Sequence, residues 1–128
     1  MRLLTCLVVA ALAALVHSAS ASASVRWFYS PSENISCEVS SGGVRGAYAF
    51  CQSVKTPKSV KLTRNGRSKV CRGGACLGNG PEDSKELAYG RSIRVGAFRC
   101  TSRESGMRCV VVKSGHGFEL SRDRIRRF

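Results

Sequence analysis

The stretch SVKLTRNGRSKVC (residues 59–71) decides the fold class of this chain. Its apolar residues Val60 and Leu62 alternate with polar neighbours, which is the pattern of a half-buried strand. The Asn-Gly dipeptide at residues 65–66 then favours a tight hairpin turn, because both residue types tolerate a positive φ angle. The stretch therefore predicts a hairpin that joins a strand at Ser59–Thr63 to a strand at Arg67–Cys71.

Short apolar runs of the same kind recur about every 8–12 residues along the chain, separated by clusters of Gly, Ser, Asn and Pro. They predict further strands at Val25–Tyr29, Ile35–Val39, Ala47–Gln52, Ser92–Val95, Phe98–Thr101, Met107–Val112 and Gly117–Leu120. RESG (103–106) is typical of a hairpin turn, and PEDSKEL (81–87) suggests one helical turn. We therefore expect an all-β fold, a small disulfide-crosslinked sandwich or barrel of short antiparallel strands.

The first 23 residues have the organisation of a secretory signal peptide. Arg2 is followed by an uncharged run at residues 3–16, and small residues with overlapping A-x-A sites follow up to Ala23. This run is too short to span a membrane, which takes about 20 apolar residues. We expect a signal peptide at residues 1–23 and one secreted domain at residues 24–128, extracellular or associated with the cell envelope, with no transmembrane segment after processing.

Seven cysteines are present, and removal of the leader takes Cys6 and leaves six. Six cysteines in a small exported domain are typical of three disulfides. We expect sequence neighbours to pair, as Cys37–Cys51, Cys71–Cys76 and Cys100–Cys109. Cys100 and Cys109 lie on strands of one predicted hairpin, and the glycines between Cys71 and Cys76 permit a tight reversal of the chain. Zinc is the alternative for Cys71-x4-Cys76, but a second pair with similar spacing is missing, so no metal or cofactor is expected.

Enzyme motifs are scarce in this sequence. His116 is the single histidine after the leader, which excludes two-histidine sites, and neither GxSxG nor HExxH occurs. We interpret His116 as a turn residue between two glycines and assign no catalytic residue. The alternative is a small secreted enzyme such as a nuclease, in which His116 and a glutamate would act as general acid and base. We interpret Trp27-Phe28-Tyr29 as an edge strand whose alternate rings fill the core, in preference to a stacking platform for sugars or bases. We interpret Glu82, Asp83 and Glu86 as a solvated turn, in preference to a calcium site.

Basic residues are the feature that stands out, with 21 Lys and Arg against 8 Asp and Glu and a formal net charge of +13. Residues 55–72 contain no acid and carry Lys55, Lys58, Lys61, Arg64, Arg67, Lys69 and Arg72. The predicted hairpin gathers Lys61, Arg64, Arg67 and Lys69 at its outward face and turn, and we predict polyanion binding there. The alternative is a solubilising surface.

Several short motifs follow one another in a recognisable order. They are SPSENISC (30–37), FCQ (50–52), CLGN (76–79), LAYG (87–90), FRC (98–100), G-x-x-C (106–109) and GHGF (115–118). Together they resemble a family of small secreted cysteine-rich proteins of high-GC Gram-positive bacteria, an uncharacterised domain. The resemblance implies one disulfide-linked secreted domain and assigns no activity. Glu33 stands where that family has glycine, so a positive φ there would strain it by about 1 kcal/mol unless Asn34 takes the left-handed position.

The sequence thus predicts a secreted, non-enzymatic domain that binds an anionic envelope or extracellular polymer, or a lipid headgroup, through a basic face. An exported inhibitor of a hydrolase, with a protein target and a rigid loop at Gly73–Gly80, is a second hypothesis. A small secreted enzyme is the third.

Overall fold

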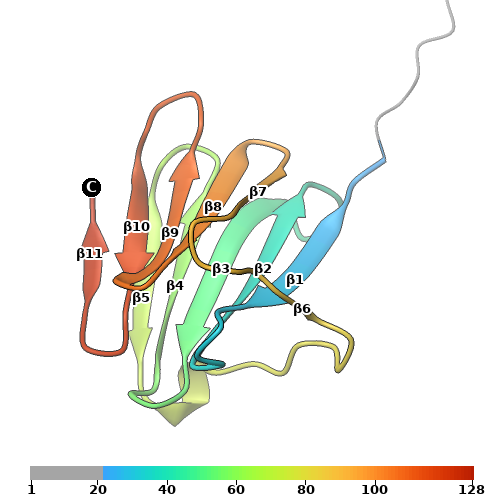
Figure 1. Ribbon diagram of the computed structural model, residues 1–128. Coiled ribbons are helices and arrows are strands. Elements are labelled where there is room, and N and C mark those ends of the chain that lie inside the picture. The colour runs from blue at the N-terminus through green and yellow to red at the C-terminus, as the bar shows by residue number, and fades with distance from the viewer. Residues whose placement is uncertain (1–21) are drawn as a thin grey trace, which may run out of the picture.

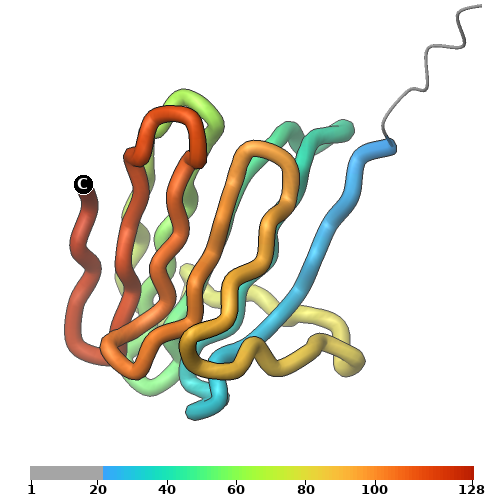
Figure 2. The backbone as a smooth tube through the Cα atoms, turned by 45° about the horizontal axis from the view of Figure 1, so that its top comes forward, coloured from blue at the N-terminus to red at the C-terminus, as the bar shows by residue number. Residues whose placement is uncertain are grey.

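Alternating apolar side chains along the strands meet in one core between two stacked β-sheets (Figures 1 and 2). The computed structural model describes residues 22–128, so the expected signal peptide at residues 1–23 lies almost wholly outside the described residues. Figure 2 shows the two layers most plainly, with the later strands (orange to red) stacked on the earlier ones (blue to green). The predicted all-β, disulfide-crosslinked fold is confirmed, and of the two expected forms it is the sandwich.

Each sheet is built from one continuous part of the chain. The first has the order β5-β4-β3-β2-β1-β6 and contains β1 (Val25–Tyr29), β2 (Ile35–Ser41), β3 (Ala47–Ser53), β4 (Lys58–Thr63), β5 (Ser68–Arg72) and β6 (Lys85–Glu86). A short 3-10 helix η1 (Gly74–Cys76) follows β5. The second has the order β11-β10-β9-β8-β7 and contains β7 (Ser92–Val95), β8 (Phe98–Arg103), β9 (Gly106–Val111), β10 (Gly117–Leu120) and β11 (Ile125–Arg127). All neighbours are antiparallel except β1 and β6, which are parallel.

Both sheets contribute fully buried side chains to the core. Val60 and Leu62 of β4 belong to the same buried cluster as Phe98 and Phe118 of the second sheet, and all four are shielded from solvent. These side chains lie at every second position of their strands, as a period of two requires. The alternating pattern therefore fixes which face of each sheet is inside and leaves the intervening polar and charged residues on the outer faces.

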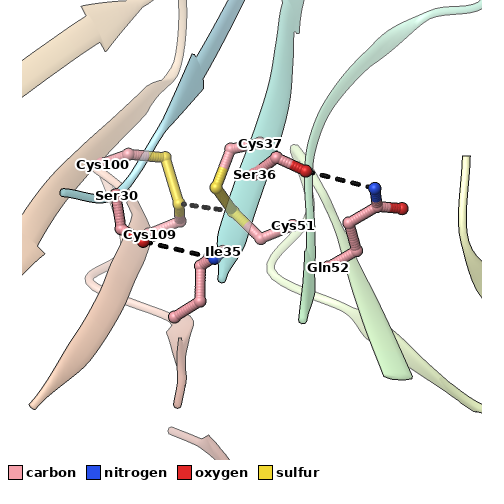
Figure 3. Close-up of a disulfide and its surroundings, with 8 residues drawn as sticks. All are labelled: Ser30, Ile35, Ser36, Cys37, Cys51, Gln52, Cys100 and Cys109. Atoms are coloured by element: carbon pink, nitrogen blue, oxygen red, sulfur yellow. Dashed lines mark hydrogen bonds between the residues drawn. A yellow bond between two sulfur atoms is a disulfide. The ribbon is translucent and has the colours of Figure 1, made fainter. Parts of the chain in front are cut away.

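Two buried disulfides lie at the centre of the sandwich, one in each sheet (Figure 3). Cys37 and Cys51 are directly opposite on β2 and β3, and Cys100 and Cys109 are directly opposite on β8 and β9. The Sγ atoms of Cys51 and Cys109 are 3.7 Å apart, so the two crosslinks touch across the sheet interface. Three of these sulfurs lie as close together as metal ligands would, but sulfurs joined in disulfides supply no thiolate.

The third disulfide, Cys71–Cys76, joins the end of β5 to η1 at the surface. Gly73 between them has a φ angle of 109°, which is the conformation that lets the chain reverse. The structure thus forms the three pairs of sequence neighbours.

Two segments depart from the sequence expectation. The helical turn predicted at residues 81–87 is wrong: Lys85 and Glu86 form β6 and pair with Phe28 and Tyr29 of β1. A single helical turn gains few internal hydrogen bonds, whereas the free edge of β1 offers backbone partners. It follows that β1 is not the edge strand that was expected.

The last residues form β11, which no periodic signal predicted. Ile125 packs against the core, and the backbone of Phe128 exchanges two hydrogen bonds with Gly117, of 2.9 and 3.0 Å. The guanidinium groups of Arg108 and Arg126 lie 4.1 and 5.5 Å from the centre of the Phe128 ring. Such cation–π contacts hold a strand of only three residues in place.

Candidate anion-binding surface

The turn between β4 and β5 differs in detail from the expected two-residue turn. Gly66 donates to the carbonyl of Thr63 and has a φ angle of 84°, but Asn65 keeps a negative φ. The side-chain oxygen of Asn65 accepts from the backbone of Arg67 (3.1 Å) and from the hydroxyl of Thr63. These bonds satisfy the turn without a left-handed asparagine, so the loop has three residues with glycine at the left-handed position.

The structure brings the four predicted basic residues together on this hairpin, and we call them the hairpin cluster: Lys61, Arg64, Arg67 and Lys69. Lys61 lies directly opposite Lys69 on the outer face of the sheet, and both are exposed. Arg64 and Arg67 flank the turn and are exposed as well. The Nζ atom of Lys61 also lies 4.3 Å from the centre of the Tyr48 ring.

Within residues 22–128, no carboxylate forms an ion pair with the hairpin cluster. In residues 22–128 there are two ion pairs, Arg122 with Asp123 and Arg126 with Glu119, each at 3.5 Å, and neither reaches the hairpin. Like charges directly opposite one another destabilise an antiparallel pair. The Lys61–Lys69 pair therefore repels itself, and an anion that bound there would remove the repulsion.

Another arginine extends the cluster. Nη1 of Arg127 in β11 lies 3.4 Å from the carbonyl of Ser68 in β5, so it lies next to Arg67 at the edge of the sandwich. In the sequence, Arg127 is 60 residues from Arg67 and lies in the basic run at residues 122–127. Its place beside the hairpin depends on how the two sheets stack, for which the sequence carries no signal.

Lys58 does not belong to the basic surface, contrary to its inclusion in the acid-free stretch. The alternation of β4 places it on the same side as Val60 and Leu62, and it is only 2% exposed. Its Nζ atom donates to the carbonyl of Arg122. Burial is the main reason that the pKa of Lys58 is lowered below 10.5, and repulsion by Arg72, its direct partner in β5, lowers it further, while Asp123 acts in the opposite direction.

We predict that stability rises with pH because of Lys58. The pKa of Lys58 is lower in the folded state than in the unfolded chain, so the unfolded chain holds the proton more tightly. Below the folded pKa, folding therefore carries the cost of burying a charged amine, and raising the pH toward 10.5 removes this cost. The free energy of unfolding of the wild type should therefore increase relative to that of Lys58→Met over the alkaline window that ends at 10.5. Urea unfolding of both proteins at pH 7, 8, 9 and 10 measures this difference, and parallel pH profiles would contradict the prediction.

The other residues singled out from the sequence lie apart from the hairpin cluster, with one exception. His116 lies in the exposed β9–β10 loop, and its Cβ is 3.0 Å from where a Cβ of Gly66 would lie, so the two hairpin tips touch. Its imidazole makes no hydrogen bond or ion pair to a carboxylate within residues 22–128. Phe28 is in the core, whereas Trp27 is 37% exposed on the outer face. Glu82, Asp83 and Glu86 are exposed around β6.

The Gly73–Gly80 loop, the candidate inhibitory loop, lies over the outer face of the first sheet. The side chain of Gln52 exchanges two hydrogen bonds of 2.7 Å with the backbone of Gly78. The Cys71–Cys76 disulfide holds the other end of this loop. The loop is thus exposed but anchored at both ends.

Fold and surface together define a small disulfide-crosslinked β-sandwich with an unneutralised basic hairpin. A family model, described as "Family of unknown function (DUF6636)", matches residues 50–128, which is more than half of the chain. The chain therefore belongs to this family, and the matched part runs from β3 to the end of the chain. No curated protein and no solved structure gives a significant match. Within residues 22–128, no helix is long and apolar enough to cross a membrane.

Proposed function

We propose that this protein is a secreted, non-enzymatic domain that binds an anionic polymer through the hairpin cluster. The observation that carries this proposal is the direct apposition of Lys61 and Lys69, with Arg64 and Arg67 beside them and no carboxylate partner in residues 22–128. Arginine suits such contacts because its planar guanidinium matches a phosphate or a carboxylate. Binding by several cations at once releases the counterions of the polymer, and this release drives association.

The disulfides support export of the protein. Three disulfides in a domain of this size are typical of an oxidising, extracellular compartment. The motif order places the chain, in our proposal, among small secreted proteins of high-GC Gram-positive bacteria, where envelope polymers and extracellular nucleic acid are the anionic partners within reach. Anionic lipid headgroups carry the same phosphate chemistry.

The test is the salt dependence of binding to heparin and to duplex DNA. Four phosphate contacts predict that the affinity for duplex DNA falls about 100-fold between 50 and 200 mM salt. The double variant Arg64→Glu/Arg67→Glu should lower the slope of log affinity against log salt by roughly two. The variant should still fold, because both side chains are exposed.

A matched control is available on the opposite sheet. Arg94 and Arg99 are also exposed, directly opposite one another and outside any ion pair within residues 22–128. Arg94→Glu/Arg99→Glu therefore changes the net charge by the same amount at a different place. Equal loss of binding in the two double variants would show a general charge effect and refute a hairpin site, as would elution of the wild type below physiological salt.

Inhibition of a hydrolase is a second candidate function, favoured by the anchored Gly73–Gly80 loop. A rigid exposed loop enters an active site at a low cost in conformational entropy. In that case the protein forms a stoichiometric complex with an enzyme that resists high salt, and Gln52→Ala, which frees Gly78, weakens it.

A further inference from the structure

A cavity of about 230 Å³ opens at the end of the sandwich away from the hairpin turn. Strand β4 runs from Lys58, next to Arg122, to Thr63 at the turn, which separates the two ends by roughly 17 Å at 3.3 Å per residue. The side chains that matter most in the cavity lining are Asn34, Lys55, Tyr89, Arg103, Glu104 and Arg122. They come from both sheets and from five separate loops, so only the folded sandwich assembles them.

Asn34 supplies a donor that no protein group uses. The residue is 5% exposed, and its Oδ1 accepts hydrogen bonds from the backbone N–H of Lys55 (2.8 Å) and from the hydroxyl of Ser53 (3.3 Å). A backbone N–H can only donate, so the oxygen is correctly placed and the other atom is the NH₂ group. That Nδ2 atom has no hydrogen-bond partner in residues 22–128.

The free Nδ2 atom faces the cavity. Among the described residues, one side-chain polar atom, Ser102 Oγ, is both inaccessible to solvent and without a hydrogen-bond partner. Nδ2 of Asn34 also has no partner but is a different atom, so it must be accessible to solvent. Since Asn34 is almost wholly buried and lines the cavity, its amide donor opens into that space. Water can reach this donor in the open cavity, and a ligand that displaces the water has to supply an acceptor in its place, so the cavity favours a ligand with acceptor oxygens.

Three basic residues line the same cavity as this donor. Lys55 comes from the β3–β4 loop, Arg103 from the β8–β9 turn and Arg122 from the segment after β10. Lys55 and Arg103 have no carboxylate within 4.0 Å in residues 22–128, and Arg122 contacts the exposed Asp123. Glu104 is the single carboxylate in the lining. The buried Lys58 donates to the carbonyl of Arg122 and so fixes the segment that carries this arginine.

We propose that this cavity binds a phosphate group. A planar carboxylate is satisfied by one arginine fork and leaves the remaining donors unused. A tetrahedral phosphate presents three oxygens in different directions, which suits a lining that takes its amide donor and its basic residues from different loops. At about 30 Å³ per water molecule, the cavity has room for a phosphate and the first atoms of the group that bears it. This site is separate from the hairpin cluster and goes beyond the proposed function.

The decisive variant is Asn34→Asp. It keeps an acceptor oxygen for Lys55 and Ser53 but replaces the NH₂ donor with a second oxygen, so the fold is retained while the ligand meets a negative charge. Loss of a hydrogen bond to a charged group predicts at least tenfold weaker binding. Calorimetric titration with inorganic phosphate and with glycerol 3-phosphate measures the affinity, and the thermal midpoint shows that the variant is folded.

A second pair of variants tests the role of charge. Arg103→Gln should weaken phosphate binding about tenfold, whereas Arg94→Gln, which removes the same charge from the outer face of β7, should leave it within twofold. The hairpin variant Arg64→Glu/Arg67→Glu should also leave it within twofold, so failure of the hairpin proposal and failure of this one are distinguishable. Tighter binding of the phosphomonoester assigns a phosphorylated ligand, and equal binding assigns free phosphate.

Three results would overturn the proposal. The first is no phosphate binding by the wild type at about 10 mM ligand, tenfold above a weak Kd of about 1 mM. The second is unchanged binding by folded Asn34→Asp, and the third is equal loss in Arg103→Gln and Arg94→Gln.

Discussion

Removal of the Cys37–Cys51 disulfide is expected to destabilise the protein more than removal of either other crosslink. The double variant Cys37→Ala/Cys51→Ala opens the loop with the largest sequence separation, 14 residues, which is worth about 3 kcal/mol in the chain-entropy model. Both side chains are also buried against Cys109, so their loss leaves space in the core. The free energy of unfolding in urea measures the effect.

The surface disulfide provides the control for this comparison. Cys71 and Cys76 are separated by 5 residues and lie at the surface, so Cys71→Ala/Cys76→Ala should cost about 2 kcal/mol with no loss of core packing. If the surface variant lost as much free energy of unfolding as the core variant, neither the longer loop nor the buried position of Cys37–Cys51 would add to stability. A refolded wild type with Cys51 joined to Cys109 would contradict the pairing itself.

Gly117→Ala is expected to prevent folding or to cost at least about 3 kcal/mol, the upper range for overpacking. A Cβ at this position would lie 2.1 Å from the carbonyl oxygen of Cys109 and 2.9 Å from Cα of Val110. Both contacts are with the backbone of the paired strand β9, which cannot rotate away. The same glycine exchanges backbone hydrogen bonds with Phe128, so the clash would also loosen β11.

Gly115→Ala, two residues earlier, is the matched control. Gly115 has a φ angle of 76° and nothing within 4 Å of a Cβ, so alanine there costs only the left-handed conformation, about 1 kcal/mol. Thermal unfolding and soluble yield of the two variants separate steric conflict from backbone strain. Similar midpoints for both would show that β9 and β10 can move apart, and would contradict the expectation that the β9 backbone cannot yield to a Cβ at residue 117.

The strands that the sequence could predict are those with a short apolar run of their own, most clearly where that run has a strict period of two. Val60 and Leu62 around Lys61, and Phe98 and Cys100 around Arg99, face as their alternation requires. Strands β6 and β11 escaped prediction because they have two and three residues and take their hydrogen bonds from β1 and β10. Such pairings are decided by free strand edges elsewhere in the fold, which a local pattern does not encode.

The candidate sites divide in the same way. Lys61 and Lys69 are near one another in sequence, and a local turn is enough to bring them together. Asn34 and Arg103 share a cavity only because the β1–β2 turn and the β8–β9 turn meet at one end of the sandwich. Glu33 shows the limit of analogy: it takes the left-handed position itself, with a φ angle of 58°, and Asn34 is thereby left free to line the cavity.

Each of the three disulfides lies within one half of the chain, so the two halves are crosslinked separately. Cys37–Cys51 and Cys71–Cys76 lie among the strands of the first sheet, Cys100–Cys109 lies in the second, and no disulfide bridges residues 77–99. A protease that cut the exposed link at residues 88–91 would therefore release two separately stapled fragments with no covalent bond between them. The apolar interface, with the touching sulfurs of Cys51 and Cys109 near its centre, would then join the fragments as a noncovalent pair, together with the hydrogen bonds from Lys58 to Arg122 and from Arg127 to Ser68.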